Sequence, residues 1–285
     1  MTRQNSIKIF DKSLTFSLTV LIVLFSFLLS MQVDAQRDEE TVAANWNFDD
    51  GSAKDSSTTG LNGTFVGNPR SDTGIVGKAL TFNGNSDGIN IPDSPHINTG
   101  GPYTDRTIAA FFKCTDITKT GKQVIFQEGG ATRGLCIYVH AGSVYVGGWN
   151  RAQYNWEGTW LSERIKANHW HHVALVLRDT TDKVENDKFE MWFDGKLADA
   201  DKGGQLYSHT NNTSIGYVTQ KSIFHDGTQD LSNVDWFTGS IDEVIVYNSA
   251  FVSADFNKIA QPLNVEPNGK FTTTWGHLKS KRMEH

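Results

Sequence analysis

The sequence predicts an all-β protein that folds as a two-sheet antiparallel sandwich. Glycine is frequent (26 of 285 residues) and proline is rare (6), which is typical of short strands joined by tight turns. Apolar segments of strand length recur roughly every 8 to 15 residues, whereas helical periodicity is nearly absent. With 38% hydrophobic residues, a chain of this length can bury one large β core, so we expect a single domain.

Two segments carry the clearest strand signals. Residues 169–178 contain an unbroken apolar run between polar ends. Phe189, Met191 and Phe193 then alternate with polar residues, which indicates a half-buried strand. Asp194-Gly195 follows, and this dipeptide favours a two-residue hairpin turn.

The other strands are assigned from the same signals. They are expected, in order, at 46–48, 77–83, 87–93, 106–113, 123–127, 135–140 and 143–146. Residues 249–259 predict a short helical turn, with Phe251, Phe256 and Ile259 docked on the sandwich. Residues 261–285 are expected to form a C-terminal tail.

The N-terminal segment predicts export. Arg3, Lys8 and Lys12 precede an almost wholly apolar run, residues 14–33, and Val33-Asp34-Ala35 fits a signal-peptide cleavage site. We therefore predict a signal peptide over residues 1–35, a polar lead-in over 36–41 and a secreted protein. The apolar run approaches the ~20 residues that span a bilayer, so an uncleaved membrane anchor is the alternative.

Export makes the two cysteines informative. Cys114 and Cys136 form an even pair in an oxidising compartment, which predicts a disulfide. Each also sits in an apolar strand segment, and two buried free thiols are the alternative. Nothing near either cysteine in the sequence would activate it as a nucleophile.

Several segments together resemble the laminin-G-like domain of the concanavalin A-like lectin/glucanase superfamily. They occur in this order: Trp46–Ser52, Gly77–Gly84 with Asp87–Ile91, Thr107–Lys113, Trp170–Val176 and Phe237–Tyr247. The resemblance covers residues 42–260. It implies a jelly-roll sandwich that usually acts as a non-catalytic module for glycans or proteins, often with a structural calcium.

Acidic residues near both ends of the domain are candidate calcium ligands. Asp50 and Asp55 follow the first strand, and Asp242 has the parity of inward-facing residues in the last strand. The first and last strands of a jelly roll usually neighbour one another, and calcium prefers oxygen ligands. Alternatively, Asp242 accepts hydrogen bonds from backbone N–H groups while Asp50 and Asp55 form turns. A second oxygen-rich turn, with Asn83, Asn85 and Asp87, is a rival site.

An aromatic loop, residues 147–161, is the candidate ligand site. Sugars stack on aromatic rings while amides and charged groups bind their hydroxyls. We expect Trp160 to be buried and Trp149, Tyr154 and Trp156 to be more exposed. Arg133, His225 and Asp226 from other loops could join the same rim. The candidate ligand-binding residues are Trp149, Arg151, Tyr154, Asn155 and Trp156.

Catalysis has weaker support. Glu185, Asp187 and Glu190 have the spacing of a glucanase signature, and retaining hydrolysis needs two carboxyls ~5 Å apart. Asn186 and Lys188 replace the apolar residues of that signature, so we read Glu185 and Asp187 as solvated. His171 and His172 face opposite sides of one strand, and the resemblance accounts for His172 as a packing residue.

The sequence therefore predicts a secreted, non-catalytic binding module with glycan as its ligand. A protein-binding adhesion or scaffold module is the alternative, and a glycoside hydrolase comes third. The net charge of −6 gives no electrostatic reason to bind nucleic acid. A membrane is a partner only if residues 14–33 are retained.

Overall fold

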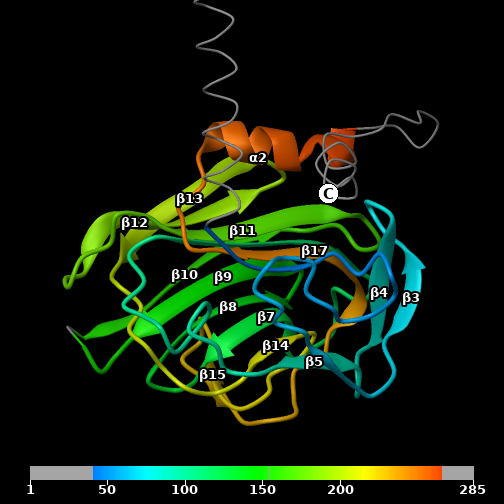
Figure 1. The fold of residues 1–285 in the computed structure, drawn as a ribbon, viewed down its shortest axis with the longest axis horizontal. Helices are drawn as coiled ribbons and strands as arrows, with labels where there is room; N and C mark the ends of the chain where they lie inside the picture. Colours follow the sequence, from blue (N-terminus) through cyan, green and yellow to red (C-terminus); the bar gives the residue numbers. More distant parts are fainter. Residues whose placement is uncertain (1–40, 154, 265–285) are drawn as a thin grey trace, which may run out of the picture. The chain divides into compact units, whose positions relative to one another are not determined.

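A computed structural model describes residues 41–153 and 155–264, which form two antiparallel sheets packed face to face (Figure 1). The predicted all-β sandwich is confirmed. The predicted signal peptide and most of the predicted tail lie outside the described residues. Within the described ranges, no helix combines the length and the apolar character needed to cross a membrane.

The eight-stranded sheet has the order β13-β12-β11-β6-β17-β4-β3, and β1 pairs with β17. Its strands are β1 (Val42–Trp46), β3 (Arg70–Thr73), β4 (Lys78–Asn83), β6 (Arg106–Cys114), β11 (His171–Leu177), β12 (Glu185–Phe193), β13 (Lys196–Gly203) and β17 (Thr238–Tyr247). The pairing of β1 with β17 brings the first and last strands together, as the jelly-roll resemblance implied.

The seven-stranded sheet has the order β10-β9-β8-β7-β14-β5-β2. Its strands are β2 (Thr64–Val66), β5 (Gly88–Ile91), β7 (Gln123–Gly129), β8 (Arg133–His140), β9 (Ser143–Asn150), β10 (Trp156–Arg164) and β14 (Thr213–Ile215). A separate small hairpin pairs β15 (Ser222–Ile223) with β16 (Gln229–Asp230).

Side-chain alternation divides the core between the faces of the sheets. In β6, Ile108, Ala110 and Phe112 belong to the main core between the sheets, whereas Ala109 and Phe111 pack on the outer face. Period-two alternation sends successive side chains to opposite faces of a strand. Both faces of β6 are therefore buried, which explains its nearly continuous apolar sequence.

The hairpin predicted at Asp194-Gly195 is confirmed. Phe193 pairs with Lys196, and the two turn residues have φ angles of +47° and +81°. Positive φ at both central positions suits a two-residue hairpin, and glycine adopts it without steric cost. The Asp194 carboxylate also accepts hydrogen bonds from the His172 backbone N–H and, at 3.0 Å, bonds to His171 Nδ1.

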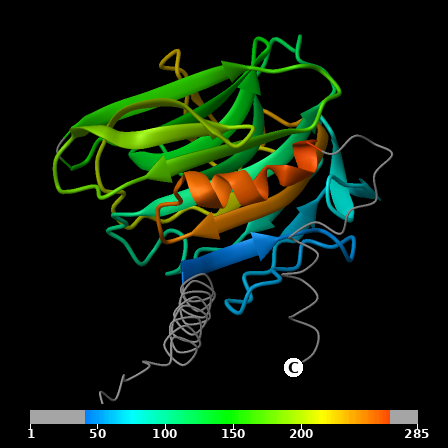
Figure 2. The ribbon, with the colours of Figure 1, turned by 90° about the horizontal axis from the view of Figure 1, so that it is seen from above.

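A short helix covers the outer face of the eight-stranded sheet. Figure 2 shows α2 (Ser253–Ile259) lying across this sheet, followed by the 3-10 turn η1 (Gln261–Asn264). Phe251, Phe256 and Ile259 pack there against a cluster that includes Phe111 and Trp192. The docking predicted for these three side chains is confirmed.

Candidate functional site

A concave pocket of about 380 Å³ lies at one end of the seven-stranded sheet. One wall is the turn between β7 and β8, and the other is part of the loop between β13 and β14. The pocket is lined by Gly130, Ala131, Thr132, Arg133, Ser208, His209, Thr210 and Asn211. We call it the rim pocket. Its polar groups lie on loops held by a rigid sandwich, a common position for binding sites.

Arg133 connects the rim pocket to the neighbouring loop. Its Nη1 donates to the Ser208 carbonyl at 2.7 Å, Nη2 donates to Gln153 Oε1 at 2.8 Å, and Nε donates to Asn150 Oδ1 at 3.2 Å. One guanidinium thus ties the β7–β8 turn to both the β9–β10 loop and the β13–β14 loop. Arg133, a sequence candidate, belongs to the pocket, and it is half-buried.

Arg151, a polar candidate of the aromatic loop, contacts a residue of the pocket lining. The Arg151 backbone N–H donates to the Thr132 carbonyl at 2.9 Å, and the Arg151 side chain forms an ion pair with Glu157 at 3.2 Å. Asn155 is exposed in the same β9–β10 loop, with a φ of +56°. The loop therefore borders the rim pocket without lining it.

The exposure predicted for the aromatic candidates is wrong. Trp149 and Trp156 are 0% and 1% exposed, so neither ring is available to stack on a sugar, while Trp160 is half-buried rather than buried. Trp149 Nε1 donates to the Gly130 carbonyl at 2.8 Å and supports the pocket turn from below. Trp156 packs against Phe189 in the main core. Tyr154 lies outside the described residues.

Trp160 is half-buried because two strand glycines make room for it. A Cβ placed on Gly147 or Gly158 would approach the Trp160 ring to 2.5 or 2.1 Å, so the indole lies over backbone that carries no side chain. An aromatic ring that covers glycines is a known device on edge strands, and β10 is an edge strand. The sequence pattern of alternating rings did not reveal this difference between the tryptophans.

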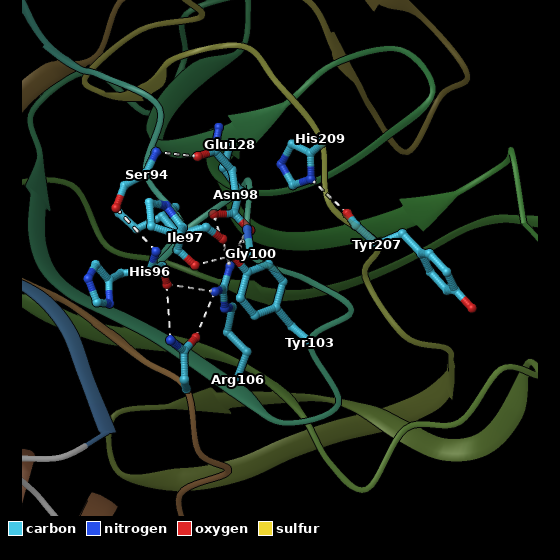
Figure 3. A network of polar contacts seen from close by, with 12 residues as sticks. Ser94, His96, Ile97, Asn98, Gly100, Tyr103, Arg106, Glu128, Tyr207 and His209 are labelled. Carbon is cyan, nitrogen blue, oxygen red and sulfur yellow. Dashed lines mark hydrogen bonds and ion pairs between the residues drawn. The ribbon is translucent and has the colours of Figure 1, made fainter.

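A buried ion pair lies between the sheets next to the rim pocket (Figure 3). Arg106, at the start of β6, donates from Nη1 to Glu128 Oε1 at 2.9 Å, and both side chains are 0% exposed. Glu128 directly precedes the Gly129-Gly130 turn. The pair therefore joins the eight-stranded sheet to the strand that carries one wall of the pocket.

Arg106 also organises the loop between β5 and β6. It donates to the carbonyl oxygens of His96 and Ile97 and to Asn248 Oδ1, and its guanidinium carbon lies 3.7 Å from the centroid of the Tyr103 ring (Figure 3). A buried charge needs a partner and hydrogen bonds to be tolerated. These contacts supply both.

The β5–β6 loop in turn holds the second wall of the pocket. Asn98 Nδ2 donates to the Asn211 carbonyl at 3.1 Å, and the His209 backbone N–H donates to the Asn98 carbonyl at 2.8 Å. His209 Nδ1 bonds to the Tyr207 carbonyl at 3.0 Å (Figure 3). Thus the Arg106 network indirectly fixes both walls of the rim pocket.

A second open pocket of about 500 Å³ adjoins the first and shares Asn211 with it. It is also lined by Gln220, Lys221, Leu231 and Ser232. Gln127 Nε2 donates to the carbonyl oxygens of Gly129 and Lys221, at 2.8 and 3.2 Å. This amide therefore links Lys221, which lines the second pocket, to the Gly129-Gly130 turn beside the rim pocket.

The predicted calcium ligands bind separate sets of protein donors. Asp50 accepts from Ser52, and Asp242 accepts from the backbone N–H groups of Ile75 and Val76. Asp55 accepts from four further residues: Asn45, Ser57, Thr59 and Leu61. In residues 41–153 and 155–264, no three His, Cys, Asp or Glu side chains are grouped so as to hold a metal ion. Calcium stays a prediction, but these three carboxylates do not gather around one position.

The predicted disulfide is wrong, because both cysteines are buried free thiols. Cys114 lies in β6 and belongs to the core between the sheets, whereas Cys136 lies in β8 and packs on the outer face of the other sheet. The alternative reading from the sequence therefore holds. Burial raises the pKa of Cys114 to about 11, which leaves it a protonated thiol at neutral pH.

The remaining candidates lie away from the rim pocket lining. Glu190 forms a half-buried ion pair with Arg178, and Glu185 is exposed and accepts from Thr181. Asp226 binds Lys122 at 2.9 Å, and His225 stacks on Tyr145 with ring centroids 4.2 Å apart. His172 is 1% exposed and packs against Phe111 and Phe256, as the resemblance implied.

Sequence reasoning did not identify Arg106, Glu128 or the 208–211 wall. The available signal was a charged residue at the end of an otherwise apolar strand: Arg106 opens β6, and Glu128 almost closes β7. Such residues are rarely fully buried unless they are paired. Pairing across two sheets, however, depends on the topology, which the sequence pattern does not provide.

Comparisons with known proteins agree with this architecture. A family model described as the concanavalin A-like lectin/glucanases superfamily, of laminin-G type, matches residues 83–255. No curated protein sequence matches the chain.

Three solved structures illustrate the fold similarity. Domain 4 of AbnA, an extracellular GH43 arabinanase of Geobacillus stearothermophilus solved with arabinotriose, is 18% identical with a TM-score of 0.56, and the match covers 78% of this chain and 98% of that one. The binding domain of botulinum neurotoxin serotype G is 10% identical (TM-score 0.59), with 77% of this chain and 50% of that one covered. The binding domain of Paraclostridial Mosquitocidal Protein 1 is 12% identical (TM-score 0.59), with 78% and 52% covered.

At these identities the solved structures support the fold alone, and the match spans about half of each toxin domain. The family match covers more than half of the chain, from the end of β4 into α2, and it includes both walls of the rim pocket. The chain therefore belongs to the concanavalin A-like lectin/glucanase superfamily, as a laminin-G-like member.

Proposed function

We propose that this protein is an exported, non-catalytic module that binds carbohydrate in the rim pocket. The lining of the pocket carries the proposal: Thr132, Ser208, Thr210 and Asn211, which carry hydroxyl and amide groups, line it together with the Arg133 guanidinium. Neutral hydrogen-bonding groups of this kind suit sugar hydroxyls, and the concave shape buries the ligand. Arabinotriose in the AbnA domain 4 structure is consistent with this ligand class.

A binding role fits the carboxylates better than hydrolysis does. Retaining and inverting glycosidases generally use two facing Asp or Glu side chains. The described lining of the rim pocket contains neither residue type. Glu190, the buried acid of the glucanase-like spacing, is engaged by Arg178 and by Trp192 Nε1.

The described surface gives less support to a protein-binding function. Large exposed apolar side chains are Phe65, Leu197, Leu231 and Val252. They lie on four separate segments: β2, β13, the loop after β16 and the residue before α2. Protein-binding surfaces usually gather such side chains into one patch. Export itself rests on the N-terminal residues 1–35.

A glycan array with three proteins tests the proposal. The wild type should retain one or more glycans, and Thr210→Trp should abolish that binding, because an indole at this exposed position fills the pocket. Thr58→Trp, at an exposed turn after β1, is the matched control and should bind as the wild type does. Retention of no glycan by the wild type, or equal binding by Thr210→Trp, would contradict the proposal.

A further inference from the structure

The charges around the rim pocket differ from those of the whole protein. The chain carries a net charge of −6, yet neither Asp nor Glu appears in the described lining of the two adjoining pockets. The lining does contain cations: Arg133 in the rim pocket and Lys221 in the second pocket. An acidic protein thus presents one positive charge in each of these two adjoining pockets.

Arg133 is an exception among the arginines that are at least half-buried. Each of the others has a carboxylate partner: Arg106 with Glu128 at 2.9 Å, Arg151 with Glu157 at 3.2 Å, and Arg178 with Glu190 at 2.5 Å. In the described part of the chain, Arg133 bonds only neutral oxygens, those of Asn150, Gln153 and Ser208. Its positive charge is oriented but not compensated.

The geometry of Arg133 leaves donors for a ligand. Each terminal nitrogen of a guanidinium carries two N–H groups, and each makes one hydrogen bond to the described residues. One further N–H on each nitrogen therefore has no partner among the described residues, and Arg133 lines the rim pocket. A guanidinium held in this way is suited to a carboxylate or sulfate, because charge-assisted hydrogen bonds to oxyanions are the stronger class.

Lys221 lines the second pocket, which adjoins the rim pocket. The two pockets share Asn211, and Gln127 holds the backbone of Lys221 against the Gly129 turn. The exposed Lys221 ammonium makes no ion pair within the described residues. Two cations in consecutive pockets match negative groups on consecutive residues of one chain-like ligand.

We propose that the ligand of the two pockets is an acidic oligosaccharide, with one carboxylate or sulfate bound by Arg133 and the next directed toward Lys221. This inference rests on the proposed carbohydrate function and specifies its substrate class. The shared chemistry is an anionic group on a sugar ring. Uronic acids and sulfated sugars are its two sources.

Paired ligands that differ only in charge test the inference. Oligogalacturonate and its methyl ester share one sugar backbone, and a carrageenan oligosaccharide and its desulfated form provide the sulfate pair. Titration calorimetry should give at least about tenfold tighter binding for one acidic ligand than for its neutral partner. The difference should shrink at high salt, because both charges are near the surface.

Four variants locate the effect. Arg133→Gln should weaken binding of the acidic ligand about tenfold more than binding of the neutral ligand, whereas Arg133→Lys should restore part of the preference for the acidic ligand. Lys221→Gln should cause a smaller loss and, being exposed, should not disturb the fold. Arg164→Gln, at an exposed arginine that donates to the Ala141 carbonyl, is the matched control and should have no effect.

The outcomes separate this inference from the proposed function. Equal affinity for acidic and neutral partners, with binding still blocked by Thr210→Trp, would overturn the acidic ligand and keep the carbohydrate site. Binding of no carbohydrate would overturn both. If Arg133→Gln lowers the melting midpoint, the test rests on Lys221→Gln and on the ligand pairs that differ only in charge. The inference is refuted if the wild type binds the acidic and neutral ligands equally and Lys221→Gln does not weaken binding of the acidic ligand.

Discussion

Arg106 and His172 lie on opposite faces of the eight-stranded sheet, and each buries an ionisable side chain almost completely. Between the sheets, Arg106 keeps its charge because Glu128 and three further oxygen acceptors surround it. Beneath α2, neither ring nitrogen of His172 has a hydrogen-bond partner in the described structure. Burial lowers its pKa to about 4, so the imidazole is neutral.

The comparison shows two roles for a buried ionisable side chain: Arg106 belongs to a network that positions the site, whereas His172 only packs. A charge-bearing pair is directional, and it fixes the β5–β6 loop and the turn after β7 at once. A neutral imidazole between aromatic rings fills space and imposes little direction. The directional Arg106–Glu128 pair lies next to the rim pocket, and the space-filling His172 lies under α2.

Removing one member of the Arg106–Glu128 pair should have the largest effect. Arg106→Met or Glu128→Leu should each lower the free energy of unfolding by about 3–5 kcal/mol, because the remaining partner is left buried without compensation. The double variant Arg106→Met, Glu128→Leu should be less destabilised than the sum of the two single variants. Urea unfolding measures all three.

The half-buried Arg178–Glu190 pair is the control for this cycle. Its side chains are 25% and 11% exposed, so Arg178→Met should cost less than Arg106→Met. If the loss of unfolding free energy in the double Arg106/Glu128 variant equals the sum of the losses in the two single variants, the two side chains act independently. That result would contradict their role as one unit.

His172 should make stability fall in mild acid. Its pKa is about 4 in the folded protein against 6.5 for an ordinary histidine, so the unfolded chain binds more protons between these values. The stabilisation is complete above pH 6.5 and is lost as the pH falls toward 4, by roughly 3 kcal/mol in total. Denaturant unfolding as a function of pH should show this slope, and His172→Leu should reduce it.

Asp194 is the charged group that opposes this effect, since its carboxylate raises the pKa of His172 and accepts from the His172 backbone N–H. Asp194→Asn should therefore steepen rather than abolish the acid slope. An unchanged slope in His172→Leu would assign the acid sensitivity to other groups and would break the comparison with Arg106.

Asp235 supplies a third case with the opposite sign. Burial and a hydrogen bond to Asp230 raise its pKa to about 7, so the folded protein holds a proton that the unfolded chain releases near 3.8. Stability from this group is present below pH 3.8 and is lost as the pH rises toward 7. Allowing for solvent screening, Asp235→Asn should raise the free energy of unfolding by about 1–2 kcal/mol at pH 8 and by almost nothing at pH 4. A gain at pH 4 equal to that at pH 8 would rule out titration as the cause.

Calcium is the smallest expected effect. The sequence predicts a rise in melting midpoint with added calcium that EDTA reverses. Asp55 and Asp242 already accept hydrogen bonds from protein donors, so the rise should be at most a few degrees. Differential scanning fluorimetry measures it, and an unchanged midpoint would contradict a structural calcium.

Much of the fold could be predicted from local patterns. The hairpin at Asp194-Gly195, the buried strand 171–177 and the helical turn carrying Phe256 follow from turn chemistry and apolar periodicity, both of which are properties of adjacent residues. The pairing of β1 with β17 required the family resemblance.

The site was only partly predictable because exposure depends on neighbours distant in sequence. Trp149 and Trp160 lie on neighbouring strands of one sheet. Trp149 is buried and donates to the Gly130 carbonyl, whereas Trp160 lies over Gly158 of the edge strand β10 and Gly147 of its neighbour β9. Cys114 and Cys136 likewise looked like a pair until the topology placed them in different sheets. Arg133 was a candidate, but only the fold shows that the described lining of its pocket contains neither Asp nor Glu.

Amide chemical-shift mapping tests the central claim most directly. A ¹⁵N-labelled sample would be titrated with the glycan that the array selects. The account predicts that the largest shifts fall on residues 130–133 and 208–211, with smaller ones at Lys221, and that Thr210→Trp removes them. Shifts centred instead on Trp160 and Tyr145, on the outer face of the seven-stranded sheet, would contradict the rim pocket as the binding site.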